Sequence, residues 1–236
     1  MASKWRRGFK KAALILLGIM AAGTLLIYAL SAPLPEGVEG PEADALANQM
    51  LNALNVEGFH QLETISFSFG EHHYLWNKAT NKVDVLWEDY QVALGLDDPS
   101  ESEAYQNGEV VEKKQSLIDK ALAYFYNDSY WLAAPYKVYD EGVERRLVKT
   151  EDGTKALLVT HTSGGVTPGD SYLWLLDDTY RPTAFKMWVS IIPIGGAKAS
   201  WEAYELVSGV PFATRHRMGP LSLFIKNLDG KPKTSD

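Results

Sequence analysis

Residues 161–177 read HTSGGVTPGDSYLWLLD, and this stretch decides between two interpretations of the chain. A phosphate-binding loop requires a strand before its glycines and a helix N-terminus after them, so that backbone N–H groups converge on the anion. Here the apolar and aromatic run SYLWLL (171–176) follows the glycines, and the run LLVT (157–160) precedes them. The order G-x-S-x-G of a hydrolase nucleophile elbow is also missing. We therefore predict a β-hairpin with the glycines in its turn.

Strand patterns extend from this hairpin in both directions along the chain. Residues 61–87 alternate polar and apolar side chains, with a hairpin loop at 77–82. After residue 144 the predicted strands run over 146–150, 156–162, 171–176, 183–191, 199–207, 212–217 and 221–228. Sequential short strands with brief turns are typical of an antiparallel meander, so we expect either a barrel or a strongly curved sheet.

Helical patterns precede and interrupt the strands. Pro41, a favourable first helical residue, begins an amphipathic helix predicted over 41–54. A second helix is predicted to begin at Ser116 and to break at residues 127–129, which read Asn-Asp-Ser. A short helix over 130–134 would then end before a proline. These helices are candidates for covering one face of the sheet.

The N-terminus combines positive charge with an apolar run. Five cationic residues precede the uncharged segment 12–30, which as a helix would rise about 28 Å, close to the hydrocarbon thickness of a bilayer. A secretory signal has a shorter apolar core, so we expect an uncleaved transmembrane signal anchor, with cleavage near residues 29–31 as the alternative. The cationic residues are Lys4, Arg6, Arg7, Lys10 and Lys11.

The charge distribution predicts how the chain is placed. Because positive charge stays on the cytoplasmic side, residues 1–11 form a cytoplasmic tail, 31–40 a linker, and 41–236 a periplasmic domain on the bacterial inner membrane. If the signal is cleaved, the domain would be secreted to the periplasm. Of 23 basic residues, 18 follow the span, against 30 acidic residues, which gives the outer part a net charge of −12. Such a surface repels phosphate backbones, so we expect no nucleic-acid partner.

Residue types that carry chemistry are sparse. The chain has no cysteine, which excludes disulfides, thiolate metal sites and a cysteine nucleophile. His72 and His73 are adjacent, and adjacent strand residues point to opposite faces, so they cannot share one metal ion. His161 with Asp170 and a nearby serine is conceivable as a triad, an alternative without positional support. We predict no catalytic residue, no metal and no cofactor, and therefore no enzyme.

Aromatic residues are the unusual feature of the predicted strands. Several strands are apolar on both faces, whereas an antiparallel sheet with one solvated face alternates cleanly. Something must therefore cover each face, and two alternatives stay open: ordinary core packing, or a cavity lined for a hydrophobic ligand. The candidate lining residues are Tyr74, Trp76, Trp87, Trp174, Phe185, Trp188 and Trp201.

The order of these parts resembles the LolA/LolB-like superfamily of periplasmic lipoprotein carriers. More locally, four runs look like an uncharacterised bacterial envelope family related to it: FGEHHYLWN (69–77), NDSYWLAAPYKVYDEGVE (127–144), TSGGVTPGDSYLWLLD (162–177) and FKMWVSIIPIGG (185–196). The resemblance implies a mainly β (α+β) fold, a curved antiparallel half-open β-barrel covered by two or three helices, here preceded by one N-terminal transmembrane helix. It also implies a hydrophobic cavity suited to acyl chains.

Two departures from the carriers matter. The chain has no cysteine for lipid modification, and a permanent anchor differs from a freely diffusing shuttle. The leading hypothesis is thus a membrane-anchored periplasmic domain that binds a lipid or lipoprotein acyl chain without a covalent bond. The first alternative is a structural or protein-interaction module of the cell envelope with a filled core and an envelope protein as partner. The second is a hydrolase that uses His161 or the His72-His73 pair.

Overall fold

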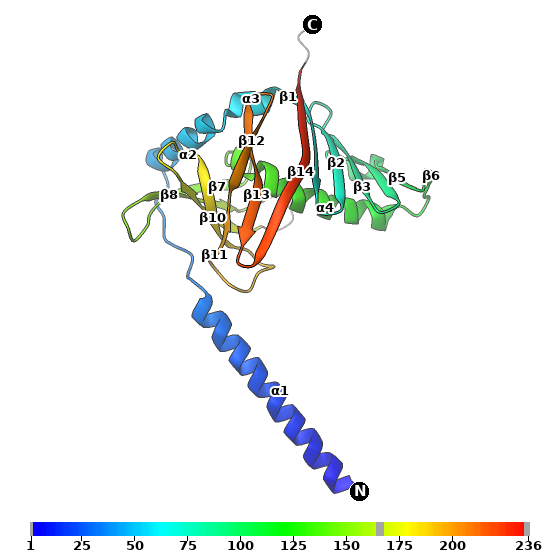
Figure 1. Cartoon of the computed structure of the whole chain (residues 1–236), viewed down its shortest axis with the longest axis vertical. Coiled ribbons are helices and arrows are strands. Elements are labelled where there is room, and N and C mark those ends of the chain that lie inside the picture. Colours follow the sequence, from blue (N-terminus) through cyan, green and yellow to red (C-terminus); the bar gives the residue numbers. More distant parts are fainter. Residues whose placement is uncertain (1, 164–167, 234–236) are drawn as a thin grey trace.

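The computed structural model describes residues 2–163 and 168–233, and the side chains among them except those of residues 2–14 and 26. A long helix leads away from a domain of two β-sheets, which three further helices accompany (Figure 1). These helices are α1 (Ala2–Leu30), α2 (Pro41–Ala53), α3 (Val56–Gln61) and α4 (Gln115–Ala133), with single 3-10 turns at Pro99–Glu101 and Ala134–Tyr136.

The larger sheet has nine strands in the order β12-β13-β14-β1-β2-β3-β4-β5-β6, and all its pairs are antiparallel. Its strands come from both ends of the domain sequence, because β14 pairs with β1. They are β1 (Leu62–Phe69), β2 (His72–Asn77), β3 (Lys82–Trp87), β4 (Tyr90–Gly95), β5 (Glu103–Gln106), β6 (Glu109–Val110), β12 (Glu202–Val207), β13 (Val210–Met218) and β14 (Leu221–Pro232).

The smaller sheet has five antiparallel strands in the order β11-β10-β9-β8-β7. They are β7 (Val143–Lys149), β8 (Lys155–His161), β9 (Ser171–Leu176), β10 (Pro182–Trp188) and β11 (Ala197–Ser200). Strand β9 pairs with β8, so the hairpin predicted around residues 161–177 is confirmed. The predicted turn glycines Gly164 and Gly165 lie outside the described residues, and Gly169 has a φ of +101° that suits glycine.

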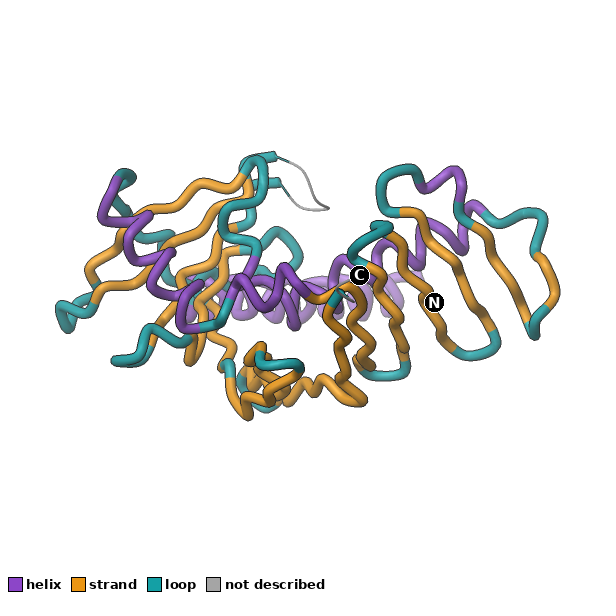
Figure 2. Tube along the Cα trace, turned by 90° about the horizontal axis from the view of Figure 1, so that it is seen from above, coloured by secondary structure: helices purple, strands orange, loops and turns teal. Residues whose placement is uncertain are grey.

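The prediction of a mainly β antiparallel domain is confirmed, and the described strands form two sheets and no closed barrel. Figure 2 shows strands toward both ends of the domain and a further group between them. The predicted strand 199–207 accounts for the difference, since it breaks at Trp201 and passes from the smaller sheet to the larger one. Trp201 N still donates to Thr183 O of β10, and Ala203 then takes a φ of +53° that redirects the chain.

The predicted break between two helices at residues 127–129 is wrong. Helix α4 runs through them because the side chain of Asp128 finds partners inside the domain. Asp128 accepts hydrogen bonds from strand β2, and Ser129 is buried. Sequence propensity favours a break at such residues, and the tertiary contacts override it.

Helix α1 covers the predicted span over 12–30, so the helical part of that prediction is confirmed. Over the part of the chain that the structure describes, no helix combines the length and the hydropathy that a membrane crossing requires. The membrane-spanning part of the prediction is thus not confirmed.

Residues 31–38, which we call the N-terminal strap, contact the smaller sheet at two places. Val38 pairs with Leu147 of β7 through two backbone hydrogen bonds of 2.8 and 2.9 Å. At the other end, Ala32 N donates to Gly195 O at 2.8 Å. The segment predicted as a linker is therefore attached to the domain near both of its ends.

Candidate functional site

Six of the seven predicted lining residues lie in one buried core between the sheets and helix α4. The most exposed of the six, Trp76, has only 7% of its surface accessible. The structure thus brings together residues from four strands, β2, β3, β9 and β10, and from the link between β11 and β12. The six residues are Tyr74, Trp76, Trp87, Trp174, Phe185 and Trp201.

Aromatic side chains of α4 occupy the space between the two sheets. On the side of the larger sheet, the ring of Trp76 lies 5.4 Å from that of Phe125. On the side of the smaller sheet, the ring of Phe185 lies 5.6 Å from that of Trp131. These are ordinary distances for packed aromatic pairs. Protein side chains therefore fill the space in which the carrier resemblance implies a cavity.

Trp188, the seventh predicted residue, points to the opposite face of the smaller sheet. It packs against a second apolar cluster that includes Leu158 and Leu173. Its Nε1 donates to Ala32 O of the N-terminal strap at 2.8 Å. Trp188 is thus separated from the other six residues by the thickness of the sheet.

The aromatic core contains polar atoms without a partner. The indole N–H groups of Trp76, Trp87, Trp174 and Trp201 are buried and lack an acceptor among the described residues, and His216 Nε2 lacks a donor. Buried polar groups are normally paired, because an unpaired one loses its hydrogen bond with water. An oxygen-bearing group, such as a carboxylate, an ester or a water molecule, has the chemistry to accept from these donors.

His216 of β13 is fully buried beside aromatic residues of the core. Its ring stands 4.5 Å from that of Trp201 and 5.2 Å from that of Trp131. Its Nδ1 lies 3.0 Å from Ser200 O, which can only accept, so Nδ1 carries the proton. Burial lowers the pKa of His216 to about 4. The side chain is therefore neutral near pH 7 and serves as part of the core.

A buried carboxylate joins α4 to strand β2. Asp128 Oδ2 lies 2.7 Å from His72 Nδ1 and 2.5 Å from the hydroxyl of Tyr74. Burial raises the pKa of Tyr74, and the hydrogen bond that its hydroxyl donates to Asp128 adds to that shift. His73 points the other way and contacts Ser68 Oγ at 2.8 Å, as expected for adjacent strand residues.

The structure does not assemble the alternative triad at His161. The carboxylate of Asp170 accepts from the backbone N–H of Ser190 at 2.9 Å, and the His161 ring instead approaches the hydroxyl of Tyr130 at 3.5 Å. Burial lowers the pKa of His161. Nor does the structure, over its described side chains, hold a group of three metal-ligating residues. The hydrolase alternative thus gains no support from these contacts.

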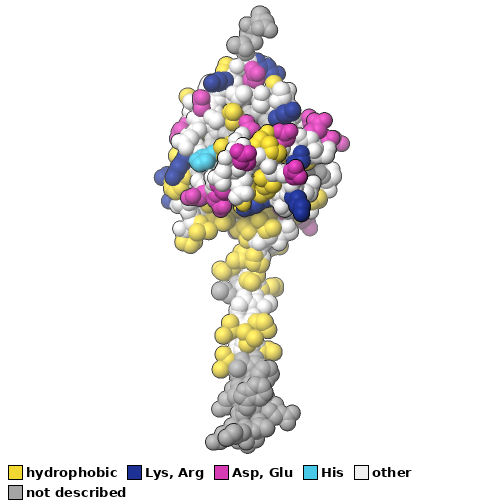
Figure 3. All heavy atoms as spheres, turned by 90° about the vertical axis from the view of Figure 1, so that its right-hand side faces the viewer, with side chains coloured by type: hydrophobic (Ala, Val, Ile, Leu, Met, Phe, Trp, Pro, Cys, Tyr) yellow, Lys and Arg dark blue, Asp and Glu magenta, His cyan; other side chains and the backbone are white. Residues whose placement is uncertain are grey.

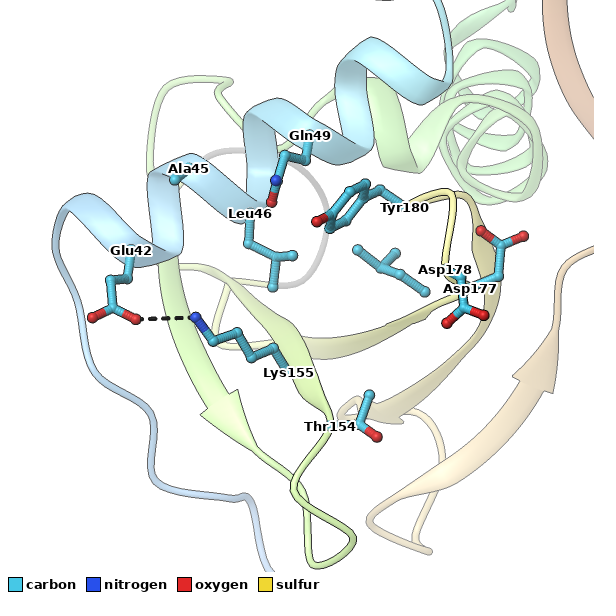
Figure 4. A pocket seen from close by; sticks show the side chains of 10 residues that line it. Glu42, Ala45, Leu46, Gln49, Thr154, Lys155, Asp177, Asp178 and Tyr180 are labelled. Atoms are coloured by element: carbon cyan, nitrogen blue, oxygen red, sulfur yellow. Dashed lines mark hydrogen bonds and ion pairs between the residues drawn. The ribbon is translucent and has the colours of Figure 1, made fainter.

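A surface groove of about 670 Å³ lies between helix α2 and two turns of the smaller sheet (Figure 4). Glu42, Asp177 and Asp178 place carboxylates at its rim, and Lys155 pairs with Glu42 at 3.3 Å. Leu46 and Tyr180 supply apolar surface. We call this hollow the acidic groove. A second hollow, of about 450 Å³, lies beside His73 and Leu86.

The turn that forms one wall of the acidic groove is tightly specified. Asp177 Oδ1 accepts from the backbone N–H groups of Thr179 and Arg181 at 2.9 and 3.0 Å. Tyr180 between them has a φ of +64°, a conformation that a bulky side chain rarely adopts. The sequence showed a turn at residues 177–182, but it gave no sign that helix α2 packs close enough to make a groove.

Comparisons with known proteins add little to this geometry. No protein-family model and no curated protein matches the sequence. Among solved structures, the chain is similar to a DUF1329 family protein from Desulfovibrio piger, with 13% identity and a TM-score of 0.39 over 82% of this chain and 95% of that one. The class of this protein is therefore described by its fold alone: two antiparallel sheets that pack against one helix, α4. The LolA/LolB-like resemblance stays a prediction.

Proposed function

We propose that this protein is a membrane-associated interaction module of the bacterial cell envelope, which binds a partner protein on its surface. The observation that carries the proposal is the filled interior. Because side chains of α4 occupy the space between the sheets, a partner must bind outside the core. The inner membrane, with the domain in the periplasm, is the location that the charge distribution of the N-terminus favours.

The side chains of α1 support association with a membrane. Apolar residues on every side of this helix are exposed, with accessible fractions of 64% at Ile15, 64% at Ile19 and 68% at Leu25. A helix that is apolar all round is stable when buried in lipid or in protein, and poorly stable in water. The described part of the domain does not cover these residues, so lipid is the occupant we propose.

The acidic groove is the proposed binding surface for the partner. Its lining carries three carboxylates against one lysine, and Leu46 and Leu176 add apolar surface. Charge complementarity therefore favours a partner that presents a cationic segment with an apolar residue beside it. The turn with Tyr180 is fixed by hydrogen bonds, so the groove is already formed before a partner binds.

Site-specific photo-crosslinking in cells tests this proposal. A photoreactive phenylalanine analogue at Tyr180 of the full chain should yield an adduct whose partner peptide is rich in lysine or arginine. Asp178→Lys should reduce that adduct severalfold by charge repulsion. Glu109→Lys, an exposed charge reversal on β6, is the matched control and should leave it unchanged. An adduct insensitive to Asp178→Lys, or an acidic partner peptide, would contradict the proposal.

A second candidate function is the binding of a hydrophobic ligand that bears an oxygen acceptor. Four buried indole N–H groups have no acceptor among the residues that the structure describes, and they favour this candidate. Such a ligand would have to displace part of α4. Brominated fatty acid should then quench the tryptophan fluorescence of the full chain, with weaker affinity in Trp201→Phe than in Trp188→Phe, which changes the opposite face. Equal affinity in the two variants, or no quenching, would rule this candidate out.

A further inference from the structure

The loop between β10 and β11, residues 189–196, is apolar and partly exposed. It reads VSIIPIGG, and Ile191 at its tip has 74% of its surface accessible. Single exposed apolar residues are common on proteins, but a run of this kind is not a typical surface turn. We call it the isoleucine loop.

Direct contacts fix the isoleucine loop beside the end of α1. Gly195 N donates to Ser31 Oγ at 2.7 Å, and Ala32 N donates to Gly195 O at 2.8 Å. The indole N–H of Trp188 donates to Ala32 O at 2.8 Å. Since Leu30 is the last residue of α1, these three bonds hold the loop within two residues of the helix end.

The close approach depends on glycine. A Cβ on Gly195 would lie 2.8 Å from Ala32 O and 2.8 Å from Trp188 Cδ1, closer than real Cβ contacts. The backbone of the loop can therefore reach the strap only at a residue without a side chain. The short distance between the loop and the end of α1 is therefore fixed by the fold.

Other apolar and cationic residues lie at the same end of the domain. Figure 3 shows hydrophobic side chains gathered where the domain meets α1. Leu34 of the strap is 44% exposed and Leu221, at the β13–β14 turn, is 56% exposed. Lys186 and Lys198 lie directly opposite each other on β10 and β11, a repulsive pair that an anionic group would stabilise.

We propose that the isoleucine loop is a second membrane contact, which enters the interfacial region of an anionic bilayer beside α1 and orients the domain on it. This inference rests on the proposed membrane association of α1. Apolar side chains partition into the boundary between head groups and acyl chains, and neighbouring lysines add attraction to anionic lipids. Helix α1 and the isoleucine loop would then both contact the membrane, side by side. Two such contacts hold the domain in one orientation on the bilayer.

The absence of cysteine from the chain makes a direct test possible, because one introduced cysteine is a unique labelling site. The full chain carrying Ile191→Cys is labelled with the environment-sensitive dye NBD and reconstituted into vesicles of phosphatidylethanolamine and phosphatidylglycerol. Leu206→Cys is the matched control, since Leu206 is 73% exposed and belongs to the β12–β13 hairpin, at the end of the domain near α3. Flotation of the vesicles reports membrane association separately.

The expected result is a blue-shifted emission and a severalfold intensity gain at position 191, with quenching by lipids that carry a nitroxide near the head group. Position 206 should show the emission of a dye in water. Flotation of the chain with identical, water-like emission at both positions would overturn the inference while leaving membrane association intact. A chain that does not float with the vesicles would overturn both.

Discussion

The hydroxyl of Tyr74 donates to Asp128 Oδ2 at 2.5 Å, and this bond ties strand β2 to the middle of helix α4. Asp128 has only 2% of its surface accessible and also contacts His72 Nδ1 at 2.7 Å. One carboxylate thus satisfies two side chains of the sheet. The buried bonds of Asp128 also explain why helix α4 continues through residues 127–129, whose sequence favours a break.

Removing this carboxylate should destabilise the domain. Asp128→Ala leaves the Tyr74 hydroxyl without an acceptor in the core, at a cost of about 3 kcal/mol in the free energy of unfolding. The loss should occur although alanine has the higher helix propensity. Urea denaturation followed by circular dichroism measures it. Asp119→Ala, on the exposed side of the same helix, is the control and should change little; equal effects would show that the buried bond contributes nothing.

The stability of the protein should fall in acid because of His216. Burial lowers its pKa in the folded state to about 4, from an ordinary value of 6.5. The unfolded chain therefore binds the proton first, so stability is complete above pH 6.5 and falls as the pH drops toward 4, by about 3 kcal/mol. Burial lowers the pKa of His161 too, and this adds to the same slope.

The measurement is urea denaturation at a series of pH values between 7 and 4. In His216→Gln the pH slope should be shallower than in the parent chain, whatever the variant's absolute stability. His60→Gln, a variant of an exposed histidine on α3, should keep the parent slope. An unchanged slope in His216→Gln would mean that the buried histidine does not set the acid sensitivity.

Trp174 distinguishes a filled core from a ligand cavity. Its side chain is fully buried and contacts Phe185 and Trp201 with ring distances of 5.2 and 5.0 Å. In a filled core, Trp174→Ala creates a void and should cost about 4 kcal/mol. In a chain that carries a bound lipid, the loss would instead depend on whether the lipid is present. Thermal melts of the purified chain before and after delipidation separate these cases.

Gly195→Ala should detach the N-terminal strap. The added methyl group would lie too close to Ala32 O and to the Trp188 ring. Either the strap backbone or the packed ring must therefore move. Limited proteolysis should then cleave within residues 31–38 of the variant, severalfold faster than in the parent chain. Ser190→Ala, in the same loop, is the control. If both variants resist proteolysis equally, the strap is held mainly by the Val38–Leu147 pair.

The sequence predicted local structure better than the arrangement of its parts. The strand pattern around residue 174 follows from two apolar runs separated by turn residues, and the structure confirms it within one or two residues at each end. Residues 199–207 read as one strand, because nothing in their pattern shows that Trp201 changes sheets. That turn depends on contacts with β10 and β13, which are distant in sequence.

The candidate site was predictable only in part, for the same reason. Period-two patterns place Tyr74 and Trp76 on one strand face, and the structure buries both. They cannot show that Phe125 and Trp131 of α4 fill the space opposite them. Trp188 belongs to a strand that is apolar on both sides, so the sequence could not tell which face met the helix and which met the strap.

The attachment of the strap has a mechanical consequence. A pull on α1 reaches the domain through Ser31 and Ala32, and the first bonds to bear it are those to Gly195 and Trp188. Tension at the N-terminus is thereby transmitted to the end of strand β10 and the loop that follows it, because the segment between helix and domain is not slack. A force on helix α1 would therefore act on the smaller sheet before it acts on the rest of the domain.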